Sequence, residues 1–388
     1  MKHRLNGFLP AVLFLAAVAG HAESIAPDIA AGRDGMLVLA LKNSSSTQAH
    51  PAVGMLLSRS CPSGRCGVFA TCSLVLVAAD VALTAAHCVE NPDKEYHAFF
   101  PGTSLMTVAA GGVTRFCDGR DDCDPVSGDL AALRLSRPVT GIAPVARSSV
   151  LPSKGVMVGH GDSAPARPDN GILREATVPI ERCGPRLLCY RFDEASPAAC
   201  NHDSGGPILS PDGLLLGLAS QTEADCVAGK GTYIRVAGPW VDSWWQDHVE
   251  RGRGSPETPV STRPVLDVDC TRQPCWSTVG AVGLRLPFEV GDNDRSLIVS
   301  INYALRTDQS GCEAPDQDSC VVDYDLELEA PETGRHLCHC ENSFNQVSVC
   351  SCELPAAGNW TAVIRSAQNT GPFQVTGRTT MLEDGAAE

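Results

Sequence analysis

The chain has 388 residues, of which 43% are hydrophobic, with 18 cysteines and a formal net charge of −15. This length and hydrophobic content suit two globular domains with packed cores and exclude a disordered chain. The acidic balance argues against nucleic acid as a partner, because phosphate binding needs clustered lysine and arginine.

The N-terminus has the features of an export signal. Lys2 and Arg4 precede an apolar run at 8–18, and the small residues Gly20 and Ala22 flank His21 in a small-x-small cleavage site. We therefore expect residues 1–22 to be a signal peptide and the protein to be secreted or periplasmic. The apolar run is shorter than the roughly 20 residues that a membrane helix needs, so we expect no membrane span. An oxidising compartment also favours disulfides as the state of most cysteines.

Residues 23–40 show no strong pattern and are either a propeptide or an unstructured extension. Beyond them, short apolar runs separated by Gly, Pro and Asp turns predict an all-β body. These runs lie at 52–57, 73–77, 130–135, 155–158 and 214–218. A helix should close this body, because Val241, Trp244, Trp245 and Val249 share one helical face.

Three motifs point to nucleophilic catalysis. Ser204 stands in CNHDSGGP at 200–207, between an aspartate and two glycines, where it should be exposed on a tight turn. His87, in LTAAHC at 83–88, can act as general base, and Asp129, in SGDLAAL at 127–133, can orient it. A serine hydroxyl is a weak nucleophile at neutral pH, so His87 must take its proton during attack.

The chain order His87, Asp129, Ser204, with these motifs, resembles the chymotrypsin/trypsin family of serine endopeptidases over about 41–250. The resemblance implies a double β-barrel that hydrolyses proteins or peptides through an acyl-enzyme, with no catalytic cofactor or metal. It also implies three disulfides, which are Cys72–Cys88, Cys183–Cys189 and Cys200–Cys226. Cys61/Cys66 and Cys117/Cys123 are further close pairs that should close short loops.

The oxyanion hole contains a departure from the family. The backbone amides of His202 and Ser204 should face the developing oxyanion, but most of the family has glycine where His202 stands. A side chain there could turn the amide away, although histidine tolerates positive φ better than most residues. His202 is either a solvent-facing substitution without a role or a titrating modulator of the pocket.

The resemblance also indicates the pocket for the side chain before the scissile bond. Ala198 falls at the pocket floor, so no carboxylate is available there for Lys or Arg. Ser220 should bind the substrate backbone, while Thr222 and Gly231 fall on opposite walls. We expect a partly narrowed, apolar pocket that takes small or medium side chains such as Ala, Val or Leu.

Activation in the family depends on a new N-terminus that pairs with the aspartate before the serine, here Asp203. Spacing from Pro51 favours Leu41, preceded by Ala40, as that N-terminus. The segment at 29–32, IAAG, is more similar in sequence to the family's activation N-terminus but lies too far upstream. We expect a zymogen that is cut before Leu41.

The region 251–266 is rich in Gly, Ser, Thr, Arg and Pro and is predicted to be a linker. Beyond it, 267–380 should form a small, disulfide-rich β-sandwich. Apolar residues alternate there at 284–290, 297–303, 324–328, 360–364 and 373–375. The run DYDL at 323–326, followed by EN at 341–342 and the aromatic strand at Trp360, resembles bacterial pre-peptidase C-terminal domains. The resemblance implies a polymer or protein ligand, a part in secretion, calcium-stabilised folding or a passive appended module.

Two CxC pairs in this domain allow zinc or disulfides. If 337–341 and 349–353 pair as a hairpin, Cys338 opposes Cys352 and Cys340 opposes Cys350, within disulfide reach. This register favours disulfides and no metal.

The combined prediction is a secreted serine endopeptidase. There are two alternative hypotheses: a catalytically silent binding protein with the same fold, and an adhesion module for cell-surface polymer.

Overall fold

The computed structural model describes residues 41–381, apart from 61–66, 121–122, 125, 164–169, 224–225, 251–260, 272–278, 280–282, 305–321, 323, 332–336, 345 and 367–370. The predicted signal peptide, the segment 23–40, the Cys61/Cys66 pair and most of the predicted linker lie outside these residues.

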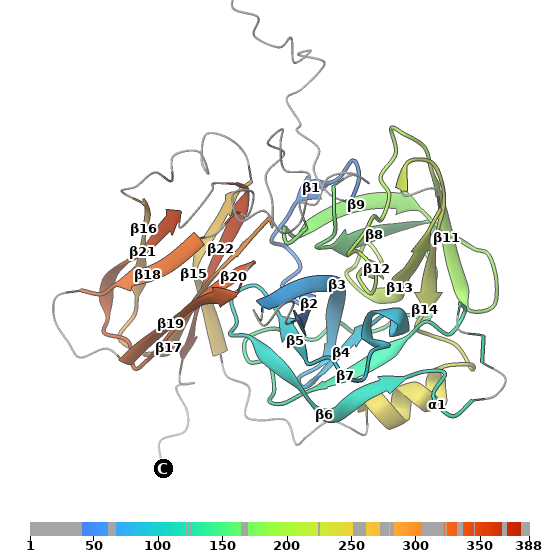
Figure 1. Cartoon of the computed structure of the whole chain (residues 1–388), viewed down its shortest axis with the longest axis horizontal. Helices are drawn as coiled ribbons and strands as arrows, with labels where there is room; N and C mark the ends of the chain where they lie inside the picture. The colour runs from blue at the N-terminus through green and yellow to red at the C-terminus, as the bar shows by residue number, and fades with distance from the viewer. Residues whose placement is uncertain are drawn as a thin grey trace, which may run out of the picture. The chain divides into compact units, whose positions relative to one another are not determined.

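Six antiparallel strands form a closed barrel in the order β2-β3-β4-β7-β6-β5 (Figure 1). They are β2 (Val53–Ser60), β3 (Gly67–Ala78), β4 (Val81–Thr84), β5 (Tyr96–Phe99), β6 (Met106–Arg115) and β7 (Ala131–Leu135). The runs at 52–57, 73–77 and 130–135 coincide with β2, β3 and β7, so these predictions are confirmed.

The following strands form an eight-stranded sheet in the order β1-β9-β8-β12-β13-β14-β11-β10. Its members are β1 (Ser45–Ser46), β8 (Lys154–Gly159), β9 (Arg174–Pro179), β10 (Glu181–Arg182), β11 (Leu187–Phe192), β12 (Pro207–Leu209), β13 (Leu215–Thr222) and β14 (Gly229–Arg235). Its core includes Met157, Ile208 and Leu216. The all-β fold class with a chymotrypsin-like arrangement is confirmed.

The predicted helix is present as α1 (Asp242–Trp245), which continues as a π-helical turn at Gln246–Glu250. Val241, Trp244, Trp245 and Val249 are all buried in one hydrophobic cluster, as their spacing predicted. Phe116 packs edge-on against Trp244, with ring centroids 5.9 Å apart.

The C-terminal strands form two sheets, β15-β22-β17-β20-β19 and β16-β21-β18, which enclose one hydrophobic cluster. The bounds are β15 (Ser261–Cys270), β16 (Leu284–Val290), β17 (Asp294–Tyr303), β18 (Tyr324–Glu329), β19 (Leu337–Phe344), β20 (Val347–Glu353), β21 (Gly358–Ser366) and β22 (Phe373–Met381). The predicted sandwich is confirmed, but β15 begins inside the range predicted as linker. Pro264 is compatible with this strand because β15 is an edge strand and its register shifts at Pro264.

The described cysteines follow the predicted pairing. Cys72–Cys88, Cys117–Cys123, Cys183–Cys189 and Cys200–Cys226 are disulfides, as are Cys338–Cys352 and Cys340–Cys350 in the β19–β20 hairpin. The disulfides predicted for the CxC pairs are therefore confirmed.

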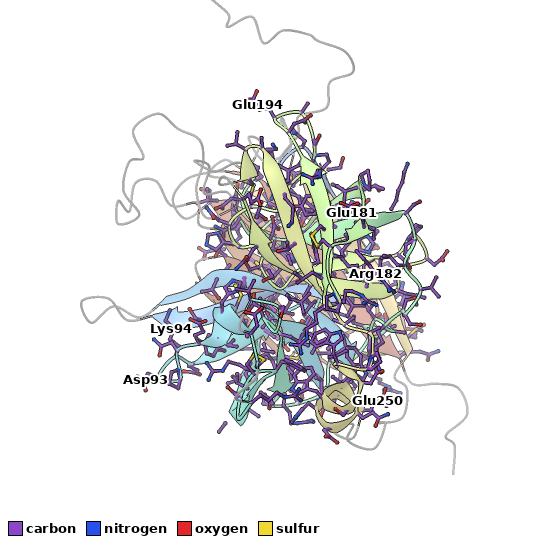
Figure 2. The ribbon with its side chains drawn as sticks, turned by 90° about the vertical axis from the view of Figure 1, so that its right-hand side faces the viewer. Asp93, Lys94, Glu181, Arg182, Glu194 and Glu250 are labelled. Atoms are coloured by element: carbon purple, nitrogen blue, oxygen red, sulfur yellow. A yellow bond between two sulfur atoms is a disulfide. The ribbon has the colours of Figure 1, made fainter. Side chains whose placement is uncertain are left out.

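Six exposed charged side chains at the periphery of the molecule are labelled in Figure 2, which are Asp93, Lys94, Glu181, Arg182, Glu194 and Glu250. Of the helices in the described part of the chain, none is both long and apolar enough to cross a membrane.

Candidate active site

Three loops at strand ends carry the predicted catalytic side chains. His87 lies in a short 3₁₀ helix, Ala86–Val89, directly after β4. Asp129 precedes β7, and Ser204 precedes β12. His87 and Ser204 both line a cavity of about 520 Å³. The closed barrel and the following sheet thus each supply a part of one site.

Asp129 holds His87 by two hydrogen bonds. The His87 backbone amide donates to Oδ1 (2.9 Å), and Nδ1 lies 2.8 Å from Oδ2. The Ser220 hydroxyl donates to the same Oδ2 at 2.6 Å, and Asp129 is buried. Because a carboxylate only accepts, Nδ1 must carry the imidazole proton, which leaves Nε2 as the basic nitrogen.

The electrostatics of this pair fit a base at neutral pH. The hydrogen bond to Asp129 outweighs burial and, with the charges of Asp129 and Glu90, raises the pKa of His87. Burial opposes ionisation of Asp129, but the bonds and charge of His87 and the Ser220 hydroxyl outweigh it and lower the Asp129 pKa. Asp129 therefore stays ionised while His87 can exchange a proton.

The turn after Ser204 requires glycine. Gly205 has φ +79°, and a Cβ there would lie 2.2 Å from Thr84 Oγ1 and 2.5 Å from the Ser73 carbonyl. The Ser73 amide in turn donates to the Ser204 carbonyl at 2.9 Å. The nucleophile loop is thus held directly against β3 by backbone contacts that tolerate no side chain.

His202 adopts the left-handed conformation that glycine supplies in most of the family, with φ +69°. Among the described residues, neither the His202 amide nor the Ser204 amide donates a backbone hydrogen bond. This backbone costs a non-glycine residue about 1–3 kcal/mol, which the surroundings must offset.

Contacts on both sides of His202 hold that conformation. Its carbonyl accepts from the Ser73 hydroxyl at 3.0 Å, and its Nδ1 lies 3.2 Å from Asp162 Oδ2. Burial lowers the pKa of His202, but the bond and charge of Asp162, with the charge of Asp203, raise it overall. The side chain is half-buried and paired, so the solvent-facing alternative predicted for His202 does not fit.

The expected pocket residues are arranged around one tyrosine that the sequence did not indicate. Tyr190 in β11 pairs with Gly231 in β14, and a Cβ on Gly231 would lie 2.1 Å from the Tyr190 ring. The Tyr190 hydroxyl accepts from the Ala199 amide at 2.8 Å and hydrogen-bonds Thr222. Ala199 and Thr222 line the cavity, whereas Ala198 is fully buried.

Asp203 lies in the interior. Its carboxylate accepts from the Gly161 and Cys200 amides, each at 2.9 Å, and burial raises its pKa to about 7. Leu41 is also buried, and the following Lys42 pairs with Ala198 as an isolated β-bridge. The Leu41 segment therefore lies beside Ala198, and its role in activation stays a prediction.

One group of potential metal ligands occurs in the described residues, formed by Cys72, His87 and Cys88. The two sulfurs are joined in a disulfide, so neither is available as a thiolate ligand. This cluster does not fit a metal ion.

Comparison with known proteins identifies relatives of the region that contains this site. A vitellin-degrading protease of Bombyx mori is 28% identical over 202 residues, which cover 44% of this chain and 75% of the relative. The thrombin-like enzyme barnettobin of Bothrops barnetti is 28% identical over 227 residues, which cover 50% of this chain and 84% of the relative. A solved structure of neuropsin, described as a serine protease expressed in the limbic system of mouse brain, is 21% identical. The match covers 51% of this chain and 94% of the neuropsin chain, with a TM-score of 0.42.

The family model described as Trypsin matches residues 42–241, just over half of the chain. The chain belongs to the trypsin family. Its class is that of the serine endopeptidases, which are hydrolases with protein or peptide substrates. The resemblance predicted from the three motifs is therefore confirmed at the level of family and enzyme class.

Proposed function

We propose that the chain is an exported serine endopeptidase in which Ser204 is the nucleophile, His87 the general base and Asp129 the residue that orients His87. The observation that carries this proposal is the set of hydrogen bonds from His87 and Ser220 to buried Asp129, beside a cavity lined by His87 and Ser204. His87 takes the Ser204 proton during attack on the peptide carbonyl and later donates it to the leaving amine.

The amides of His202 and Ser204 stabilise the oxyanion of the tetrahedral intermediate. Each such donor contributes roughly 3 kcal/mol in comparable sites. The left-handed backbone of His202 supports this role, because it reproduces the conformation that a glycine gives without strain. The same observation counts against the silent binding protein, which was suggested by the His202 side chain together with the absence of the family's usual activation sequence.

The pocket takes small or medium apolar side chains before the scissile bond. Tyr190 supports this preference, because its ring fills the space beside Gly231 and its hydroxyl bonds Ala199 and Thr222. Burial raises the Tyr190 pKa to about 12, so the phenol stays neutral and offers no charge to Lys or Arg.

Export is supported by the six described disulfides, since such bonds persist in oxidising compartments. The N-terminal signal, the zymogen segment and a ligand of the C-terminal sandwich are parts of the proposal that rest on the sequence.

Substitution of Ser204 tests the proposal. Ser204→Ala and His87→Ala should each lower kcat for peptide hydrolysis by roughly 10⁴ to 10⁶, because they remove members of one proton-transfer unit. Ser136→Ala, at an exposed serine outside the cavity, is the control and should match the wild type. Wild-type turnover in purified Ser204→Ala protein would refute the assignment.

A further inference from the structure

The C-terminal sandwich packs against the closed barrel through a hydrophobic cluster to which both contribute residues. Val347 and Val349 of β20 bury their side chains with Met55, Leu57 and Phe99 of β2 and β5. The turn between β19 and β20 therefore lies on the protease barrel. Gln346, in this turn, is fully buried.

Gln346 is held in a defined orientation by two backbone groups of the protease region. Its Oε1 accepts from the Ala70 amide at 2.9 Å, and its Nε2 donates to the Asn170 carbonyl at 3.1 Å. A backbone amide can only donate and a backbone carbonyl can only accept, so the side-chain amide cannot be reversed. Nε2 must face Asn170.

This orientation determines that of Asn170. Gln346 Nε2 also donates to Asn170 Oδ1 at 2.7 Å, so Asn170 Nδ2 must point the other way. There it donates to Asp162 Oδ1 at 3.0 Å, beside the Asn170 backbone amide at 3.2 Å. Asn170 and Asp162 are both buried. The Asp162 carboxylate is thus fixed from the side of the C-terminal domain.

Asp162 then contacts the residue at the oxyanion position. Its Oδ2 lies 3.2 Å from His202 Nδ1, and Asn170 Nδ2 lies 3.3 Å from the same nitrogen. His202 is in the left-handed region and needs external support, which glycine would not need. The chain of contacts Gln346, Asn170, Asp162, His202 links a domain outside the family match to the nucleophile loop.

We propose that Gln346 is a positioning residue for the oxyanion hole, so that the C-terminal domain completes the protease site through Asn170, Asp162 and His202. This inference rests on the proposed function, in which the His202 amide is an oxyanion donor. It gives the sandwich a role in turnover that does not require a ligand of its own.

The structure offers a matched control in Gln374. This glutamine is also buried in the C-terminal domain and also bridges to protease backbone, since it accepts from the Leu173 amide at 3.0 Å and donates to the Thr47 carbonyl at 3.1 Å. None of its described contacts is to Asn170, Asp162 or His202. Gln374→Ala should therefore remove a comparable interdomain contact without affecting the oxyanion position.

The test compares kcat, KM and thermal unfolding of full-length Gln346→Ala and Gln374→Ala. Both should unfold at a lower temperature, but Gln346→Ala alone should lose kcat, by about tenfold or more, with KM within about twofold of wild type. Loss of a whole oxyanion donor costs 10²–10³, which sets the upper bound, and transition-state contacts affect kcat rather than KM.

A double-mutant cycle with His202→Gly isolates the coupling. In the His202→Gly background, Gln346→Ala should no longer lower kcat, because glycine needs no side-chain support. If Gln346→Ala fails to fold, Asn170→Asp tests the same link within the protease region and should also lower kcat. Equal kcat for Gln346→Ala and Gln374→Ala, wild-type kcat in Asn170→Asp, or an unchanged effect in the His202→Gly background would overturn the inference. Turnover that survives Ser204→Ala would instead overturn the proposed function.

Discussion

At the scale of single residues, we expect Tyr190 to limit the size of the substrate side chain, because its ring fills the space beside Gly231. Tyr190→Ala should open space beside Gly231 and raise kcat/KM for peptides with Leu, Met or Phe before the scissile bond by about tenfold or more relative to Ala. One methylene in such a pocket is worth about 1–3 kcal/mol. A peptide-library profile of the variant measures this shift.

Tyr190→Phe is the control for this prediction, because it keeps the ring and removes the hydroxyl that contacts Ala199. It should keep the preference for small residues. An unchanged profile in Tyr190→Ala would mean that the Tyr190 ring does not limit the size of the pocket.

We expect the protonation of His87 to determine how the activity depends on pH. The base must be neutral, and its pKa is raised above 6.5 by the bond to Asp129. Activity should therefore be complete above this raised pKa and fall as pH drops through it. A pH profile of kcat/KM should give an acid limb with an apparent pKa above 6.5.

His202 also has a raised pKa and lies in the same cavity, so His202→Gly is the discriminating variant. The acid limb should persist in it. Loss of the limb in His202→Gly, or a wild-type limb below 6, would assign the titration to another group.

The sequence predicted the reactive residues but not the full pocket. Ser204, His87 and Asp129 stand in motifs whose chemistry depends on local neighbours. Tyr190, by contrast, contacts Ala199 and Thr222 of the cavity wall only because β11 pairs with β14, which places Tyr190 opposite Gly231. That register arises from tertiary pairing and has no local signal.

At the scale of elements, the β19–β20 hairpin is closed by two disulfides, Cys338–Cys352 and Cys340–Cys350. Replacing Cys340 and Cys350 together by serine should destabilise the sandwich by about 2–5 kcal/mol. Since the hairpin turn carries Gln346, kcat should also fall. Denaturant unfolding and peptide hydrolysis measure the two effects.

Chelation is the control for this experiment. Reducing agent should inactivate the protein, whereas EDTA should not, because the paired cysteines have no thiolates for zinc. Inactivation by EDTA with restoration by zinc would contradict the disulfide assignment.

Strand register in this hairpin followed from the sequence because two CxC pairs permit one antiparallel alignment that pairs all four cysteines. Strand β6 was not predicted. Its pairing with β7 shifts between Val108 and Val113, so its burial does not alternate regularly and the period-two signal is lost.

At the scale of the whole molecule, activation should depend on the bond after Ala40. Asp203 is buried, with its pKa raised to about 7, so a cation that reaches it would be strongly favoured. Removing residues up to Ala40 should free the Leu41 ammonium to pair with Asp203 and switch activity on. Ala40 is also the kind of residue that the proposed pocket accepts, which would allow self-cleavage.

N-terminal sequencing of active protein, together with Asp203→Asn, measures this step. The active form should begin at Leu41, and Asp203→Asn should not respond to removal of the segment. Full activity in protein that begins at Glu23 would mean that another group satisfies Asp203.

The C-terminal sandwich was predictable from the alternation of apolar residues, but its contact with the protease region was not. Gln346 and Gln374 resemble ordinary surface residues in the sequence. They are buried because each satisfies backbone groups of the protease region, and such complementarity exists only after both domains have folded.

Covalent labelling shows whether Ser204 is an activated nucleophile. Mature protein treated with a fluorophosphonate probe should carry one label per chain, which peptide mapping by mass spectrometry should locate on Ser204. The Ser204→Ala protein should remain unlabelled, whereas the Ser136→Ala control should label like wild type. Absence of label on the folded, mature protein, or stoichiometric label at another residue, would contradict the account.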